Sequence, residues 1–118
     1  VTPHFIPERT SLEEPVFFWA YEIEIANEGG IAVQLVSRRW VIVDAIGREE
    51  IVEGLGVVGE QPLLEPGETY EYTSGVPLST PTGIMSGTYQ MVARDGTQFD
   101  VDIPAFSLDS PHMKPILN

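Results

Sequence analysis

The chain has 118 residues, of which 42% are hydrophobic, contains no cysteine and carries a formal net charge of −12. This length fits one domain that buries about 65% of its unfolded surface, and the absence of cysteine excludes disulfides and thiolate metal sites. The negative net charge argues against nucleic acid as a partner, because it repels phosphates. The six basic residues are also dispersed, and only Arg38 and Arg39 are adjacent, so no basic stripe could neutralise several phosphates together.

A membrane location is also disfavoured. No apolar run approaches the roughly 20 residues that a bilayer crossing requires, and residues 1–5 have neither a basic nor an apolar leader pattern. The sequence therefore predicts a cytoplasmic protein without membrane contact. We expect a single domain over 1–118, with a less regular N-terminal segment over 1–15 and a C-terminal tail over 109–118.

Strand signals recur along the chain, whereas helical periodicity is missing almost everywhere. Strand character is found in residues 19–25, 33–43, 50–53, 68–73, 88–93 and 97–103. About seven short antiparallel strands without intervening helices favour an all-β fold, a two-sheet β-sandwich of the immunoglobulin or fibronectin type III kind, with a barrel as the alternative. Inward alternation places six aromatic side chains in the expected core: Trp19, Tyr21, Trp40, Tyr70, Tyr72 and Tyr89.

Two strands carry finer expectations. The run 33–43 is too long to alternate cleanly, which predicts either a bulge near 37–39 or burial of both faces toward its end. Asp95 and Gly96 predict a type I′ turn, after which Phe99, Val101 and Ile103 face inward. Pro104 is expected to end that strand, and Phe106 and Leu108 to pack back onto the core.

The segment 54–59 matches the dinucleotide pattern GxGxxG, but the context of that motif is missing. Glu60-Gln61-Pro62 follows, so no helix has room to form behind the glycines and receive a pyrophosphate, and Glu60 adds an adverse charge. We interpret the segment as a structural loop whose Leu55, Val57 and Val58 dock onto the sandwich. The alternative is an anion-contacting loop, with Gly54, Gly56, Gly59 and Gln61 as its residues.

A stretch rich in Gly, Pro, Ser and Thr runs from residue 74 to residue 87. We interpret it as a long ordered loop, because patterned segments flank it closely. Loops on a rigid scaffold commonly carry binding residues, so this stretch is a candidate partner-binding loop. Its candidate residues are Ser74, Gly75, Gly83, Met85 and Gly87.

Catalytic and metal chemistry find little support. The two histidines, His4 and His112, lie near the ends of the chain without a local partner pattern, so we expect no enzyme activity, no catalytic residue and no cofactor. Four carboxylates, those of Glu22, Glu24, Asp100 and Asp102, are expected on solvent-facing sides of strands. Their spacing matches no calcium loop, and we assign no metal site.

Motifs along nearly the whole chain resemble one known family. The matching stretches are 37–40 leading to Asp44, 54–62, 64–67, 72–75, 83–89 and 99–106. In content and order they are similar to the ApaG family of small bacterial β-sandwich proteins, whose domain also occurs in eukaryotic F-box proteins and in a polymerase-interacting protein. The chain departs from many relatives at Arg39, where they carry histidine, which argues against a metal or catalytic role there.

The resemblance implies a fibronectin type III-like fold in a cytoplasmic bacterial protein linked with cobalt and magnesium tolerance. It also implies an association with diadenosine polyphosphate metabolism, and supplies no catalytic residues. The leading hypothesis is a non-enzymatic interaction module for a protein partner, which could be a second copy of the chain. The alternative is a sensor of magnesium or cobalt, or of a nucleotide polyphosphate such as diadenosine tetraphosphate.

Overall fold

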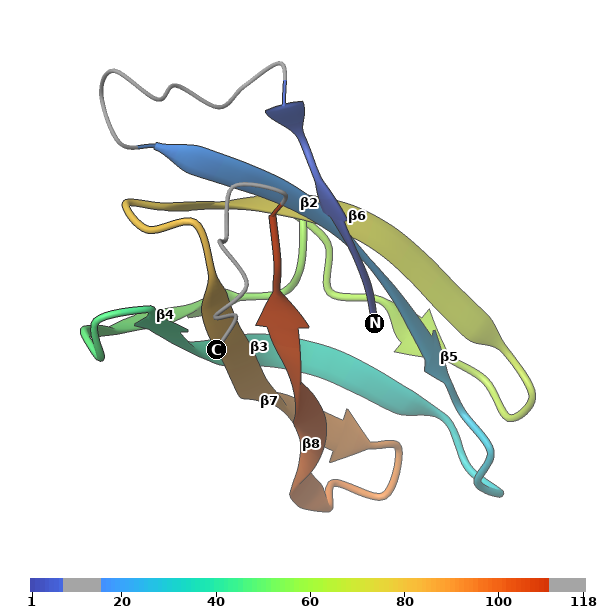
Figure 1. Cartoon of the computed structure of the whole chain (residues 1–118). Helices are drawn as coiled ribbons and strands as arrows, with labels where there is room; N and C mark the ends of the chain where they lie inside the picture. The colour runs from blue at the N-terminus through green and yellow to red at the C-terminus, as the bar shows by residue number, and fades with distance from the viewer. Residues whose placement is uncertain (8–15, 111–118) are drawn as a thin grey trace.

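The computed structural model describes residues 1–7 and 16–110, which form two antiparallel β-sheets stacked face to face (Figure 1). The three-stranded sheet has the order β1-β2-β6, and the larger sheet has the order β4-β3-β7-β8, with β5 also paired to β3. The strands are β1 (Thr2–Phe5), β2 (Phe17–Ala26), β3 (Val33–Asp44), β4 (Glu49–Leu55), β5 (Leu63–Leu64), β6 (Thr69–Leu78), β7 (Gly83–Ala93) and β8 (Gln98–Leu108). The predicted β-sandwich is confirmed.

The core lies between the inner faces of the two sheets. Trp40 from β3 meets Tyr21 from β2 edge to face, with ring centroids 5.5 Å apart, and contacts Phe106 in the same way at 6.1 Å. Such edge-to-face pairs stabilise beyond the burial of their area. Of the six aromatic residues expected in the core, all but the half-buried Tyr70 are buried.

Two irregularities bend the larger sheet. The register between β3 and β7 shifts between Leu35 and Ser37, which confirms a bulge close to the predicted place. A second shift occurs in the β7–β8 ladder between Met85 and Gly87. Pro104 lies opposite this second shift, inside β8, so the expectation that it ends the strand is wrong: a bulge accommodates the residue that lacks an N–H donor. Leu108 is buried and Phe106 half-buried, as expected.

The predicted loop over 74–87 is wrong for most of its length. Strand β6 continues to Leu78 and β7 begins at Gly83, so residues 79–82 alone connect them. The glycines misled the sequence reading because they serve packing in the sheet: a Cβ atom on Gly87 would lie 2.3 Å from the Arg39 carbonyl oxygen. Close approach of a neighbouring backbone is a known reason for glycine inside a strand.

Two smaller expectations also need correction. Residues 2–5 are not irregular but form β1, whose partner β2 supplies the hydrogen bonds. Residues 8–15 of this segment and residues 111–118 of the tail lie outside the described residues. The turn before β8 is not type I′, because Gly96 has a positive φ of 90° and Asp95 does not. Gly96 N donates to Ala93 O and Ala93 N to Thr97 O, which closes the three-residue hairpin loop instead.

Candidate functional site

The first two residues of the GxGxxG segment, Gly54 and Leu55, end β4, and the other four begin the connection to β5. Val57 and Glu60 exchange two backbone hydrogen bonds, of 2.8 and 2.9 Å, around a two-residue turn. The turn residues Val58 and Gly59 have φ values of 44° and 81°, as a type I′ turn requires. A β-branched residue with positive φ is an outlier, so the chain holds Val58 in a strained conformation.

Several hydrogen-bond donors around these glycines are directed at the protein's own carbonyl oxygens. Gly56 N and Gln61 Nε2 both donate to Val36 O, at 2.8 and 2.9 Å. Arg38 Nη1 donates to Leu55 O at 3.1 Å and to Gly56 O at 2.9 Å. An anion bound here would have to displace these contacts, which hold the connection against β3.

The segment docks onto the sandwich through one residue rather than three. Val57 is buried as expected, but Leu55 and Val58 are 74% and 53% exposed, so the expectation that they dock is wrong. The physical reason differs between the two: Val58 lies at the tip of the tight turn, and Leu55 ends strand β4 with its side chain on an exposed face, while Val57 belongs to the core cluster. The segment therefore combines a buried anchor with an exposed apolar tip.

The second candidate set does not form a free loop. Ser74 and Gly75 lie in β6, and Gly83, Met85 and Gly87 lie in β7, with the Met85 side chain in the core. These residues are thus placed on two strands of different sheets, and no exposed loop unites them.

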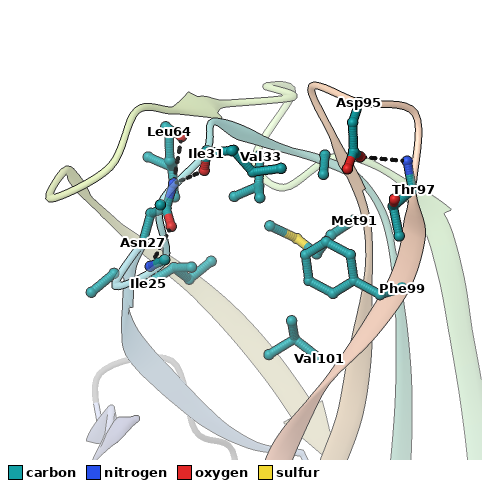
Figure 2. A pocket seen from close by; sticks show the side chains of 14 residues that line it. Ile25, Asn27, Ile31, Val33, Leu64, Met91, Asp95, Thr97, Phe99 and Val101 are labelled. Carbon is teal, nitrogen blue, oxygen red and sulfur yellow. Dashed lines mark hydrogen bonds between the residues drawn. The ribbon is translucent and has the colours of Figure 1, made fainter.

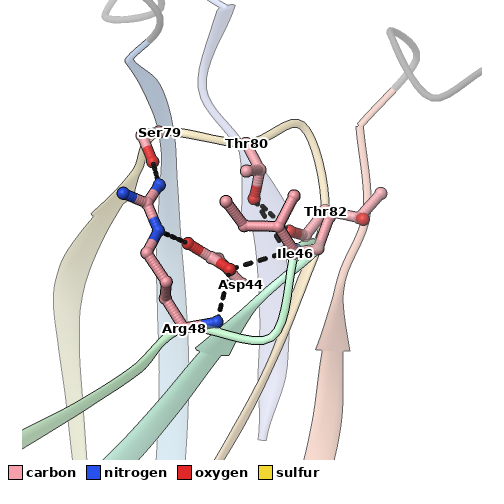
Figure 3. A network of polar contacts seen from close by, with 7 residues as sticks. Asp44, Ile46, Arg48, Ser79, Thr80 and Thr82 are labelled. Atoms are coloured by element: carbon pink, nitrogen blue, oxygen red, sulfur yellow. Dashed lines mark hydrogen bonds and ion pairs between the residues drawn. The ribbon is translucent and has the colours of Figure 1, made fainter.

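The actual connection, residues 79–82, is fixed by polar contacts to the β3–β4 turn (Figure 3). Arg48 Nε donates to Asp44 Oδ2 at 2.9 Å, and its Nη2 donates to Ser79 Oγ at 2.6 Å. Partial desolvation of Asp44 opposes its ionisation, but hydrogen bonds from Arg48 and from the Ile46 backbone outweigh it and hold the pKa of this carboxyl below its usual range. Ala45 N also donates to Thr80 Oγ1.

A cavity opens at the opposite end of β3, where the two sheets diverge (Figure 2). Its volume is about 390 Å³. We call it the mouth and define it by its apolar side chains: Ile25, Ile31, Val33, Leu64, Met91, Phe99 and Val101. Phe99 and Val101 point into it from β8 as the alternation predicted, yet each is 38% exposed because the cavity is open to solvent, whereas Ile103 is buried.

Polar side chains at the rim of the mouth maintain its shape. The buried Asn27 amide donates to Ile31 O and Leu64 O, both at 2.9 Å, and its Oδ1 accepts from Gly29 N. Asp95 Oδ1 accepts from Thr97 N at 2.9 Å, and hydrogen bonds from Thr97 lower the pKa of Asp95. Because both groups are engaged with the backbone, what the mouth offers a ligand is mainly apolar contact.

Sequence reasoning identified Phe99 and Val101 as inward-facing but missed the cavity. The divergence of two sheets is a long-range property that the spacing of one strand does not report. One local signal was available: Ile31 directly follows the turn glycines Gly29 and Gly30, where a large exposed apolar residue is unexpected.

The buried tyrosines form a separate polar cluster inside the sandwich. The hydroxyl groups of Tyr72 and Tyr89 lie 2.5 Å apart, in hydrogen-bond contact. Burial, together with this contact, raises the pKa of Tyr72, and burial raises the pKa of Tyr89 to about 12. Burial also raises the pKa of Tyr21. All three phenols therefore stay protonated near neutral pH and serve the core.

The carboxylates singled out in the sequence are exposed but lie on different sheets. Glu22 and Glu24 belong to β2, and Asp100 and Asp102 to β8. His4 Nε2 lies 3.4 Å from Glu22 Oε2, and Arg39 Nε lies 3.9 Å from Glu53 Oε1. Residues 1–7 and 16–110 contain no cluster of three or more acidic or histidine side chains that could hold a metal ion.

The same residues contain no helix long and apolar enough to span a bilayer.

The fold and the mouth define an all-β sandwich of the immunoglobulin or fibronectin type III kind, with an apolar cavity at one end. The sequence profile described as the ApaG domain matches residues 7–93. Protein ApaG from Paramagnetospirillum magneticum is 58% identical over 118 residues, which cover 100% of this chain and 91% of the relative. Protein ApaG from Azorhizobium caulinodans is 60% identical over 117 residues, with coverages of 99% and 90%. The chain belongs to the ApaG family.

Solved structures agree with this assignment. A crystal structure of a Bordetella pertussis protein that carries the name ApaA superposes with a TM-score of 0.90 at 47% identity, covering 95% of this chain and 91% of that chain. A second X-ray structure, a structural genomics target, gives a TM-score of 0.90 at 40% identity, with coverages of 99% and 89%. The sandwich of this chain is therefore like those of experimentally determined structures.

Proposed function

We propose that this protein is a non-enzymatic, cytoplasmic interaction module that binds another protein through the mouth. The observation that carries the proposal is the open apolar cavity of about 390 Å³, with Phe99 and Val101 exposed on a rigid strand beside it. Aromatic side chains that anchor in pockets contribute much of the affinity of protein interfaces.

The chemistry around the mouth supports a protein partner over a polyanion. None of its lining residues is basic. Arg94, in the same turn as Asp95, is engaged by Glu65, with Nη2 and Oε1 2.6 Å apart. A polyphosphate or nucleic acid would therefore meet apolar side chains and a repulsive net charge of −12.

The proposal also supplies a route to the cobalt and magnesium tolerance implied by the family resemblance. A module without its own metal site would act on metal tolerance through the protein that it binds. It would serve as a rigid adaptor rather than a catalyst, because Asp95 is the one titratable side chain among the lining residues and has no acid or base partner in the lining.

Site-specific photo-crosslinking tests the proposal. A photoreactive phenylalanine analogue replaces Phe99 in one variant and Ile46 in a matched control. Ile46 is 70% exposed in the β3–β4 turn, at the other end of β3 from the mouth. Irradiation in cell extract should yield a protein adduct at position 99 that position 46 does not form.

Competition makes the test specific to the mouth. Unlabelled wild-type protein should suppress the adduct, whereas a Val101→Asp variant should not, because it places a charge in the apolar cavity. The same adducts at both positions, or an adduct at position 99 that both competitors suppress equally, would refute binding through the mouth.

The second candidate is a small-ligand sensor of a divalent cation or of a nucleotide polyphosphate, and the net charge of −12 favours the cation as its ligand. Calorimetric titration with magnesium, cobalt and diadenosine tetraphosphate distinguishes the candidates. A sensor should release or absorb heat and gain thermal stability on ligand addition. No heat and no stabilisation at millimolar ligand would eliminate this candidate.

A further inference from the structure

Strand β8 is an edge strand of the five-stranded sheet, and its first half borders the mouth. We propose that the partner binds by adding an extended segment to this edge, over Gln98–Asp102, with apolar side chains alternating with lysine or arginine. This inference rests on the proposed function and names the chemistry of the partner. Strand addition to an exposed sheet edge is a recurrent mode of peptide recognition.

The two faces of β8 prescribe the alternation. Phe99 and Val101 point into the mouth, whereas Asp100 and Asp102 alternate with them and are exposed on the opposite face. A segment paired with this strand has the same period of two, so its side chains beside Phe99 and Val101 would cover the open cavity. Its other side chains would lie beside the two aspartates, at the short distances of cross-strand pairs.

The charges on this edge favour a basic segment. Among the described residues, neither Asp100 nor Asp102 forms an ion pair, and their β7 partners in the register, Gln90 and Thr88, are neutral. Lysine or arginine opposite the aspartates would gain cross-strand attraction. A second copy of this chain is disfavoured, because antiparallel pairing of two β8 strands would bring aspartates close together and unite two chains of charge −12.

The length of the site is limited by contacts at the other end of β8. Trp19 Nε1 donates to Asp109 O at 2.7 Å, and Phe106 packs against Tyr21 with ring centroids 6.2 Å apart. These contacts tie the second half of the strand to β2. The accessible half of the edge therefore holds about five residues of a partner, roughly 17 Å of extended chain.

The other edge strand of the five-stranded sheet, β4, provides an internal comparison. It also carries exposed acidic residues, including Glu49 and Glu50, but the cavity of about 290 Å³ beside it has four charged side chains in its lining, those of Asp44, Arg48, Glu49 and Glu50. If basic segments bound to any acidic edge, β4 would serve as well as β8. The combination of an edge, carboxylates and a cavity lined mainly by apolar side chains distinguishes β8.

The probe for the test is a labelled nine-residue peptide of alternating valine and lysine, titrated into the full chain by fluorescence anisotropy at physiological salt. Three control peptides are a valine–glutamate peptide, a block peptide of the same valine and lysine composition, and an N-methylated peptide that lacks half of its amide donors. We expect each control to bind at least tenfold more weakly. Hydrogen exchange should slow at the amides of residues 98–102 when the alternating peptide binds.

Charge reversal locates the site. The double variant Asp100→Lys/Asp102→Lys should prefer the valine–glutamate peptide, whereas Glu49→Lys/Glu50→Lys, with the same change in net charge, should keep the wild-type preference. Equal effects of the two double variants, equal binding of the N-methylated or block peptide, or no binding of the alternating peptide would overturn the strand-addition proposal. A crosslink at position 99 without peptide binding would leave the interaction module standing and refute only this mode of binding.

Discussion

Replacing Gly56 and Gly59 separately by alanine tests how the GxGxxG connection is built. Both have positive φ, 62° and 81°, and this alone costs alanine about 1 kcal/mol. A Cβ atom on Gly59 meets nothing within 4 Å, whereas on Gly56 it would lie 2.2 Å from the Glu60 carbonyl oxygen. Gly56→Ala must therefore also displace the turn and loosen the buried Val57, which adds about 2 kcal/mol.

Urea unfolding followed by circular dichroism measures the difference. With a slope of about 1.5 kcal/mol per molar urea, the unfolding midpoint of Gly56→Ala should lie about 1.3 M below that of Gly59→Ala. Both variants should keep the wild-type slope, because the area exposed on unfolding is unchanged. Equal midpoints would refute the packing role of Gly56 and show that positive φ is the whole requirement of this segment.

Polar groups elsewhere give three more expectations. Burial raises the pKa of Tyr72, and it raises the pKa of Tyr89 from the ordinary 10.0 to about 12. The free energy of unfolding should therefore be undiminished below pH 10 and fall between about pH 10 and 12. A rise in tyrosinate absorbance while the β-sheet circular dichroism persists would contradict this. Because the pKa of Asp44 is lowered, its ionised carboxylate stabilises the folded state at pH values above its ordinary pKa of 3.8. The difference in melting temperature between wild type and Asp44→Asn should therefore close as the pH falls below about 4, and a constant difference would argue against this role. Asn27→Ala should cost about 2 kcal/mol in chemical unfolding by leaving two carbonyls of the mouth without their donor, and a loss below about 0.5 kcal/mol would show that water replaces the amide.

Sequence patterns predicted the parts of the fold that local alternation determines. The period of two in β2 placed Trp19 and Tyr21 inside and Glu22 outside, as the structure confirms. The loss of alternation in β3 predicted either a bulge near 37–39 or burial of both faces, and the structure has a bulge between Leu35 and Ser37. Both signals arise within one strand, where the pleat alone decides which side chains share a face.

The errors share a different cause, since they depend on contacts between distant strands. Gly75 looked like a loop residue, but a Cβ atom there would lie 2.5 Å from Phe18 Cζ on the neighbouring strand. The short strand β1 has a pattern too weak to recognise and exists because β2 provides its partner. Local composition does not report such contacts.

The candidate site shows the same division. Sequence context correctly indicated that no helix follows Gly59, since β5 comes next. It did not reveal that the Arg38 guanidinium would hold the carbonyls of Leu55 and Gly56, because Arg38 precedes them by a full strand and turn. The mouth was missed for the reason that the two sheets create it jointly.

The long sequence separation between paired strands affects how fast the chain folds. The central β2–β6 and β3–β7 ladders join distant segments, as in the contact of Ser37 with Gln90, 53 residues apart. Chains dominated by such non-local pairings fold slowly, because the entropy of closing a long loop is lost before the stabilising contacts between the strands form. The mouth takes residues from β2, β3, β5, β7 and β8, so it forms only when the last strands have docked. A partner that binds there would recognise the finished protein and ignore nascent or partly folded chains.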